Sequence, residues 1–153
     1  EEMELSQEKV DKIYWTGMVH DIGKTVIPHQ ILNKKGPLTK VEYKKIKQHP
    51  EWGYKTLNKS EQLKSIAEYV RYHHEWWNGT GYPAGLAGEE IPLVSRIIGV
   101  ADAWDAMRSN RPYRDALSRK AAIKEIKASK GSQFDPRIAE VFLNVIDQIE
   151  MNS

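Results

Sequence analysis

The sequence predicts an all-α fold. Apolar residues recur three and four positions apart in several segments, as they do along one face of a helix. The glycines and prolines fall between these segments rather than inside them, and no stretch shows the sustained alternation that is typical of a β-strand. The chain has 153 residues and no repeat or Ser/Gly linker, so one domain is expected.

The first helix is expected to begin after Ser6, which is a good N-cap, and to run into His20 and Asp21. Its core-facing side is predicted at Val10, Ile13, Gly17 and Met18.

Two further helices are expected before residue 75. Thr39 and Glu42 form a capping box for a helix that reaches Gln48, just before His49 and Pro50. The next helix starts at Ser60. Its apolar face is predicted at Leu63, Ile66, Ala67 and Val70, and the same spacing continues to His73 and His74.

A long loop rich in glycine and proline is expected from Glu75 to Leu93, and such loops in compact domains are usually functional. A helix then runs from Leu93 to about Met107. Another begins at Ser118 and has Gly131 at its end, and the last begins at Asp135-Pro136.

The composition excludes several classes of protein. Without cysteine the chain has neither disulfides nor thiolate metal sites, so any metal must be held by nitrogen and oxygen. No apolar run approaches the roughly 20 residues of a membrane span, and the acidic start is unlike a secretory signal. With 23 basic and 21 acidic residues, the formal charge of +2 is too small to indicate a groove for polymeric nucleic acid. A cytoplasmic location without membrane insertion is expected.

Imidazoles and carboxylates at helix ends and on core-facing stripes make up the candidate metal site. Such side chains are the usual ligands of divalent iron, manganese or zinc when thiolates are absent. Six of them exceed what one metal needs, whereas two metals about 3.5–4 Å apart would use them naturally. Asp21 is the best candidate for a bridge between the metals. The candidate ligands are His20, Asp21, His49, His73, His74 and Asp102.

Each of these residues also has a simpler explanation. A single histidine at a helix end is more often a cap or a core residue, although the adjacent pair His73-His74 is harder to explain in that way. Asp102, in an otherwise apolar helix segment, needs a partner, and an ion pair with Arg96 or Arg71 would serve.

Basic and aromatic residues near these ligands are candidates for binding a phosphate-containing ligand. Lys24 follows the His-Asp pair, and Gly23 allows a turn that would aim its ammonium at a phosphate. Arg111 and Arg114 could grip phosphate oxygens or form surface ion pairs. Tyr82 could face substrate or anchor its loop, and Trp76 and Trp77 are expected as core or loop anchors, with purine stacking as the alternative.

Taken in order, these motifs resemble the HD-GYP domains, a branch of the HD metal-dependent phosphohydrolases. The resemblance covers the chain from about Leu5 to Ile146. It is carried by the blocks His20-Asp-Ile-Gly-Lys24, His49-Pro-Glu-Trp-Gly53, His73-His-Glu-Trp-Trp-Asn-Gly-Thr-Gly-Tyr-Pro83, Asp102, Arg111-Pro-Tyr-Arg114 and Gly131-Ser-Gln-Phe-Asp-Pro136.

The resemblance implies a bacterial signal-transduction enzyme with an HD-domain helical bundle and a long GYP loop. It implies hydrolysis of cyclic di-GMP to pGpG or GMP, in which a metal-bound hydroxide attacks phosphorus. Two or three divalent metal ions, with iron or manganese favoured, would be held by the six candidate ligands, with Asp21 bridging. Lys24 would neutralise developing charge and, together with Tyr82, Arg111 and Arg114, would face the cyclic dinucleotide.

Members of the family carry a further histidine ligand upstream of the HD motif, farther than the nineteen residues that precede His20 here. Residues 1–153 are therefore expected to be an N-terminally incomplete HD-GYP-like domain. A sensory or receiver domain in the same parent chain and a diguanylate cyclase are expected partners. The alternative function is a catalytically weak or inactive module that senses cyclic di-GMP or docks onto a protein.

Overall fold

The computed structural model describes residues 3–110 and 115–151, and in that part of the chain it is helical without a named β-strand. Ser6, Thr39 and Ser118 cap their helices as predicted, and Thr39 forms the complete capping box with Glu42. The helices are α1 (Gln7–Val19), α2 (His29–Leu32), α3 (Lys40–Ile46), α4 (His49–Leu57), α5 (Lys64–Arg71), α6 (Leu93–Arg108), α7 (Arg119–Ala128) and α8 (Pro136–Met151), with short 3₁₀ turns η1 (Ile22–Val26), η2 (Glu61–Leu63) and η3 (Gly88–Glu90).

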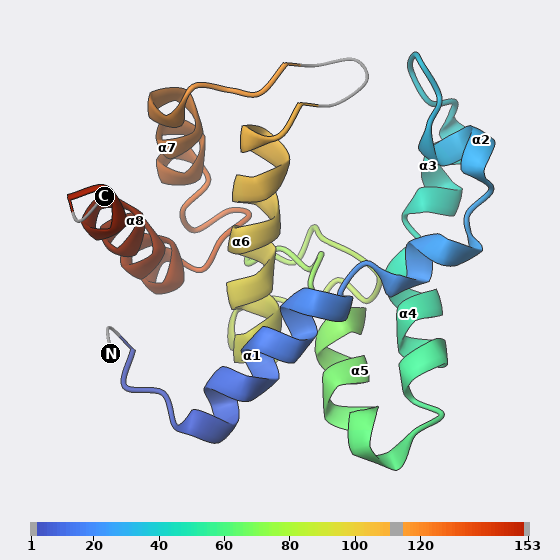
Figure 1. Ribbon diagram of the computed structural model, residues 1–153, viewed down its shortest axis with the longest axis horizontal. Helices are drawn as coiled ribbons and strands as arrows, with labels where there is room; N and C mark the ends of the chain where they lie inside the picture. The colour runs from blue at the N-terminus through green and yellow to red at the C-terminus, as the bar shows by residue number, and fades with distance from the viewer. Residues whose placement is uncertain (1–2, 111–114, 152–153) are drawn as a thin grey trace.

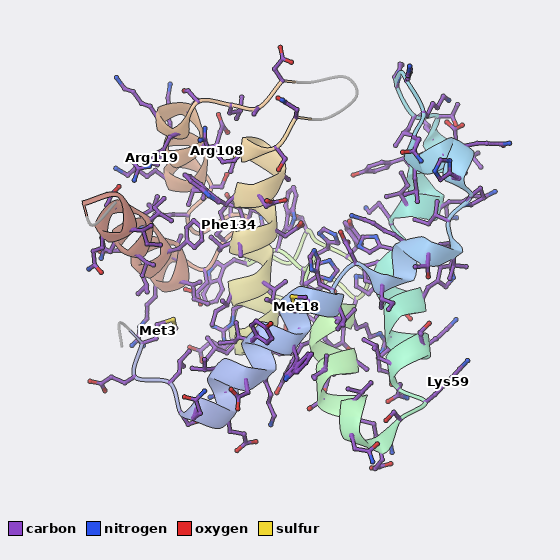
Figure 2. The ribbon with its side chains drawn as sticks, in the orientation of Figure 1. Met3, Met18, Lys59, Arg108, Arg119 and Phe134 are labelled. Atoms are coloured by element: carbon purple, nitrogen blue, oxygen red, sulfur yellow. The ribbon has the colours of Figure 1, made fainter. Side chains whose placement is uncertain are left out.

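Helix α6 stands in the middle of the molecule (Figure 1). Helices α7 and α8 pack on one side of it, while α1, α5 and α4 lie on the other, and α2 and α3 form a separate projection beside η1. One hydrophobic cluster joins α6, α7 and α8 around Phe134, whose position between these helices is seen in Figure 2. A second cluster joins α4 and α5 through Leu57, Ile66 and Val70. The loop from α5 to α6 reaches the turn between α7 and α8, where the N–H groups of Trp77 and Asn78 donate to the carbonyls of Gln133 and Ser132.

The predicted core face of α1 is wrong in part. Val10 and Met18 are 43% and 65% exposed, and Met18 is labelled on α1 in Figure 2. The side that packs inward contains Thr16, which is fully buried, and Gly17, which closely approaches Ile98 of α6. Because this side is rotated relative to the predicted one, it brings His20 to the interior at the end of the helix.

Three elements that precede α5 were not predicted. Helix α4 begins at His49 itself, and Pro50 is accommodated in its first turn, where the missing N–H would have no helical partner. Turn η1 and helix α2 occupy a segment expected to be a loop and are too short to show a periodic pattern.

Among the residues that the structure describes, no helix combines the length and apolar character needed to cross a bilayer.

Candidate metal centre and cavity

Three of the four clustered histidines are oriented by the same local arrangement. In His20, His49 and His73 the ring nitrogen Nδ1 donates to the backbone carbonyl three residues earlier, at 2.7, 2.7 and 2.6 Å. The acceptors belong to Gly17, Ile46 and Val70, in the last turns of α1, α3 and α5. These carbonyls would otherwise lack a helical donor, so each histidine caps a helix. Because the proton is on Nδ1, the Nε2 lone pair is available as a metal ligand.

The cluster formed by these residues and His74 is compact. The rings of His73 and His74 are 4.1 Å apart, and those of His20 and His73 are 5.3 Å apart. The ligand atoms of His49, His73 and His74 all lie within 4.8 Å of one another. Burial lowers the pKa of His73 to about 4, and burial together with the neighbouring imidazoles also lowers the pKa of His74. Both rings are therefore neutral at pH 7.

Asp21 lies between two of these histidines and Lys24. Its Oδ1 is 3.3 Å from His49 Nε2, and its Oδ2 is 3.5 Å from His20 Nε2 and 2.6 Å from Lys24 Nζ. Burial raises the pKa of Asp21, but the Lys24 ammonium 2.6 Å away lowers it, and the pKa lies well below its usual range. Asp21 is therefore a carboxylate at neutral pH.

Several buried atoms of the cluster lack a hydrogen-bond partner within the described residues: Asp21 Oδ1, His49 Nε2 and His73 Nε2. With the His49 proton donated to a carbonyl, Asp21 Oδ1 and His49 Nε2 approach each other as two acceptors. Such an arrangement is costly in the absence of a cation, because buried polar atoms are normally paired. The donor set, of imidazole nitrogens and a carboxylate, therefore fits a divalent metal.

Asp102, on α6, belongs to the same cluster. Its Oδ1 is 3.6 Å from His20 Nε2. Burial raises the pKa of Asp102, but the interaction with the nearby His20 ring outweighs burial, and the pKa lies below its usual range. Neither arginine considered as its partner serves that purpose, since Arg71 pairs with Glu51 at 2.7 Å and Arg96 pairs with Asp135 at 2.7 Å. The structure thus brings together the six candidate ligands.

Glycines allow the segments that carry these residues to approach closely. A Cβ on Gly23, in η1, would lie 1.9 Å from the carbonyl oxygen of His49 and 2.6 Å from the nitrogen of Gly53. Any side chain at this position would separate η1 from α4. The contact between the two backbones places Asp21 and Lys24 beside His49.

The α5–α6 loop is held by Glu75, a residue that sequence reasoning did not assign a role. The residue is 7% exposed, and its carboxylate accepts hydrogen bonds from the backbone N–H groups of Ala84, Gly85 and Leu86 at 2.6 to 3.1 Å. The signal in the sequence was an acidic residue next to the histidine pair and before a glycine-rich loop. Glu75 therefore organises the loop rather than joining the ligand cluster.

Tyr82, in this loop, stacks on His74 with ring centroids 5.0 Å apart and an interplanar angle of 25°. Lys47 Nζ lies 4.4 Å from the centroid of the Tyr82 ring. Burial raises the pKa of the Tyr82 hydroxyl above its usual range, so the hydroxyl is a neutral donor at pH 7. Tyr82 therefore does more than anchor its loop, because it lines the cavity beside the histidine and aspartate cluster.

A cavity of about 690 Å³ opens over the cluster. Its wall includes His49, His73, His74 and Asp102 at the metal end, together with Lys24 and Tyr82. Trp76 and Trp77 also line it, which places both indoles beside the cavity rather than in the remote core. Arg111 and Arg114 lie outside the described residues.

Comparison with known proteins gives a consistent picture. A family model described as HD domain matches residues 1–138. The chain is 41% identical over 152 residues to a cyclic di-GMP phosphodiesterase response regulator of Xanthomonas campestris, an alignment that covers 98% of this chain and 40% of the relative. It is 37% identical over 146 residues to a 3′3′-cGAMP-specific phosphodiesterase of Vibrio cholerae, covering 94% and 28%.

Among solved structures, the chain resembles a cyclic GMP-AMP specific phosphodiesterase of Vibrio cholerae with a TM-score of 0.70, at 22% identity and over 95% of this chain and 40% of that one. This likeness supports the fold. The chain spans about two fifths or less of the length of these relatives.

Proposed function

This chain belongs to the HD domain family, in its HD-GYP branch, and on that premise we propose that it is a metal-dependent phosphodiesterase domain that hydrolyses a cyclic dinucleotide. Cyclic di-GMP is the proposed substrate, with the linear dinucleotide pGpG or GMP as product. The relatives support this class of substrate, because they are named as phosphodiesterases of cyclic di-GMP or of 3′3′-cGAMP.

A divalent metal centre would be held by the six clustered residues, with Asp21 between two metals. The observation that carries the proposal is the set of unpaired, buried lone pairs on Asp21, His49 and His73. The two histidines line one end of the cavity, and Asp21 Oδ1 lies 3.3 Å from His49 Nε2. When bound there, divalent metals would activate water and stabilise the charge that develops on a phosphodiester.

The chain's own residues would supply binding and orientation. The Lys24 ammonium, 2.6 Å from Asp21, would place a positive charge beside the phosphoryl oxygens. The Tyr82 hydroxyl, kept neutral by burial, would donate a hydrogen bond to substrate. Arg111 and Arg114 remain proposed contacts for a second phosphate.

Hydrolysis assays test this proposal directly. Protein loaded with iron(II) or manganese(II) is expected to convert cyclic di-GMP to the linear dinucleotide or GMP, and removal of the metal with a chelator should abolish the reaction. Parallel assays with 3′3′-cGAMP would establish which cyclic dinucleotide is preferred. Absence of product from every metal-loaded form would refute the assignment. Tight nucleotide binding without turnover would instead favour a sensing or docking module.

A further inference from the structure

Two exposed tyrosines of this protein have different surroundings. Tyr43, on α3, is 54% exposed and lines the cavity above the metal cluster. Tyr14, on α1, is 60% exposed, does not line that cavity, and contacts its neighbour Trp15 edge-on at 5.4 Å. Of the two, Tyr43 is therefore the one that lines a space that a ligand could enter.

Tyr43 is connected to the metal end of the cavity through Lys47. The ammonium of Lys47 lies 5.7 Å from the centroid of the Tyr43 ring and 4.4 Å from that of the Tyr82 ring. Tyr82 in turn stacks on His74. The four side chains therefore form one row of contacts that leads from the histidine and aspartate cluster to the exposed ring of Tyr43, and His74, Tyr82 and Tyr43 of this row line the cavity.

The cavity is larger, and its lining more aromatic, than binding of a phosphodiester alone requires. A cavity of about 690 Å³ has room for more than one phosphate group. The substrate class of the proposed function also carries planar bases, each attached through a ribose to the phosphate. An exposed aromatic face is a surface on which any base can stack, and the stacking contributes substantially to binding.

We propose that the Tyr43 ring is a stacking platform for a nucleobase of the substrate, while the scissile phosphate lies at the histidine and aspartate cluster. This inference rests on the proposed function and adds a base subsite to it. The ring provides the contact and the hydroxyl is dispensable. Lys47 holds this row of contacts together and places a positive charge between the base subsite and the metal end.

The test compares three variants of the metal-loaded full chain: Tyr43→Leu, which removes the ring, Tyr43→Phe, which retains it, and Tyr14→Leu as a matched exposed tyrosine outside the cavity. For each variant, KM and kcat are measured with cyclic di-GMP, and the Kd of the nucleotide is measured by calorimetry. Metal content and thermal unfolding are recorded alongside. Both tyrosines lie on the helix surface, so the substitutions leave the core intact.

Tyr43→Leu is expected to raise KM and Kd about 5- to 150-fold, the effect of losing one base–aromatic stack, without loss of bound metal. Tyr43→Phe should recover most of the affinity, and Tyr14→Leu should match the wild type. A KM within twofold of wild type for Tyr43→Leu would overturn the base subsite while leaving the proposed function intact. An equal loss in Tyr43→Phe would also overturn it, because the hydroxyl would then be responsible. A wild-type protein that neither binds nor hydrolyses the nucleotide would refute the proposed function and the base subsite together.

Discussion

Replacement of Gly23 by alanine should separate the two segments that carry Asp21 and His49. The added Cβ would lie 1.9 Å from the His49 carbonyl oxygen, and real Cβ atoms essentially never approach such an atom within 3.0 Å. Both partners are backbone in packed elements, so neither can rotate away. Turn η1 must therefore shift from α4 by about 1 Å.

The size of the effect follows from that shift. Overpacking of this kind typically costs about 1–3 kcal/mol of unfolding free energy, or a decrease of several degrees in Tm for a domain of this length. A displacement of about 1 Å at a catalytic group can reduce activity about 100-fold. Gly23→Ala is therefore expected to lower stability moderately, and metal affinity and activity more strongly.

Gly17→Ala is a matched control, because it adds the same methyl group at a glycine inside α1. There the new Cβ would meet Ile98 at 3.5 Å, which is an ordinary contact, and alanine favours the helix by about 0.5–1 kcal/mol. Chemical unfolding and metal titration of both variants provide the assay. If Gly23→Ala kept wild-type stability and metal affinity, the close approach of η1 and α4 would not be the device that positions Asp21.

Three further predictions concern single side chains. Asp21→Asn should lower the metal content measured by elemental analysis, because a neutral amide is a poor bridge between cations. The control Asp105→Asn, at an exposed position on α6, should leave the metal content unchanged. An unchanged metal content in Asp21→Asn would show that Asp21 is not a ligand. Glu75→Gln should destabilise the α5–α6 loop by about 1.5–3 kcal/mol and accelerate hydrogen exchange at residues 84–86. The control Glu89→Gln, at an exposed position, should leave that exchange unchanged. Equal exchange rates in the two variants would contradict the role of Glu75 in holding the loop. In the metal-free protein, His73 should contribute a loss of about 3 kcal/mol of unfolding free energy as pH falls from about 6.5 to 4, because its pKa is lowered to about 4 in the fold and the unfolded chain binds the proton first. Urea unfolding at both pH values, compared between the wild type and His73→Gln, measures this contribution, and an unchanged pH dependence in His73→Gln would contradict it.

The elements that could be predicted from the sequence are those governed by local interactions. The caps of α1, α3 and α7 were predicted because a hydroxyl at the first position needs only nearby backbone N–H groups. Helix α4 was missed because His49-Pro50 suggested the end of a helix, whereas proline is equally compatible with a first turn. The core side of α1 was misplaced because packing against α6, rather than hydrophobicity, determines which side turns inward.

For the site, residue types indicated which side chains could bind a metal, and the order of the motifs indicated the family. What could not be predicted is how the rings are held. The acceptors for His20, His49 and His73 are backbone carbonyls, which every residue possesses, so no side chain marks them. The role of Glu75 depends on the path of a loop that periodicity cannot trace.

The bonds from three histidines to the carbonyls three residues earlier give helix length a role in the chemistry. Each ring is oriented by a hydrogen bond to the carbonyl three residues earlier, so the number of residues between the helix end and the histidine is fixed. One residue inserted between a histidine and its carbonyl would turn the ring by about 100° and remove its acceptor at once. Insertions in the loop between α2 and α3 or in the α7–α8 turn, by contrast, change no such count. Tolerance to changes in chain length should therefore be lowest in the final turns of α1, α3 and α5, even where their residues face solvent.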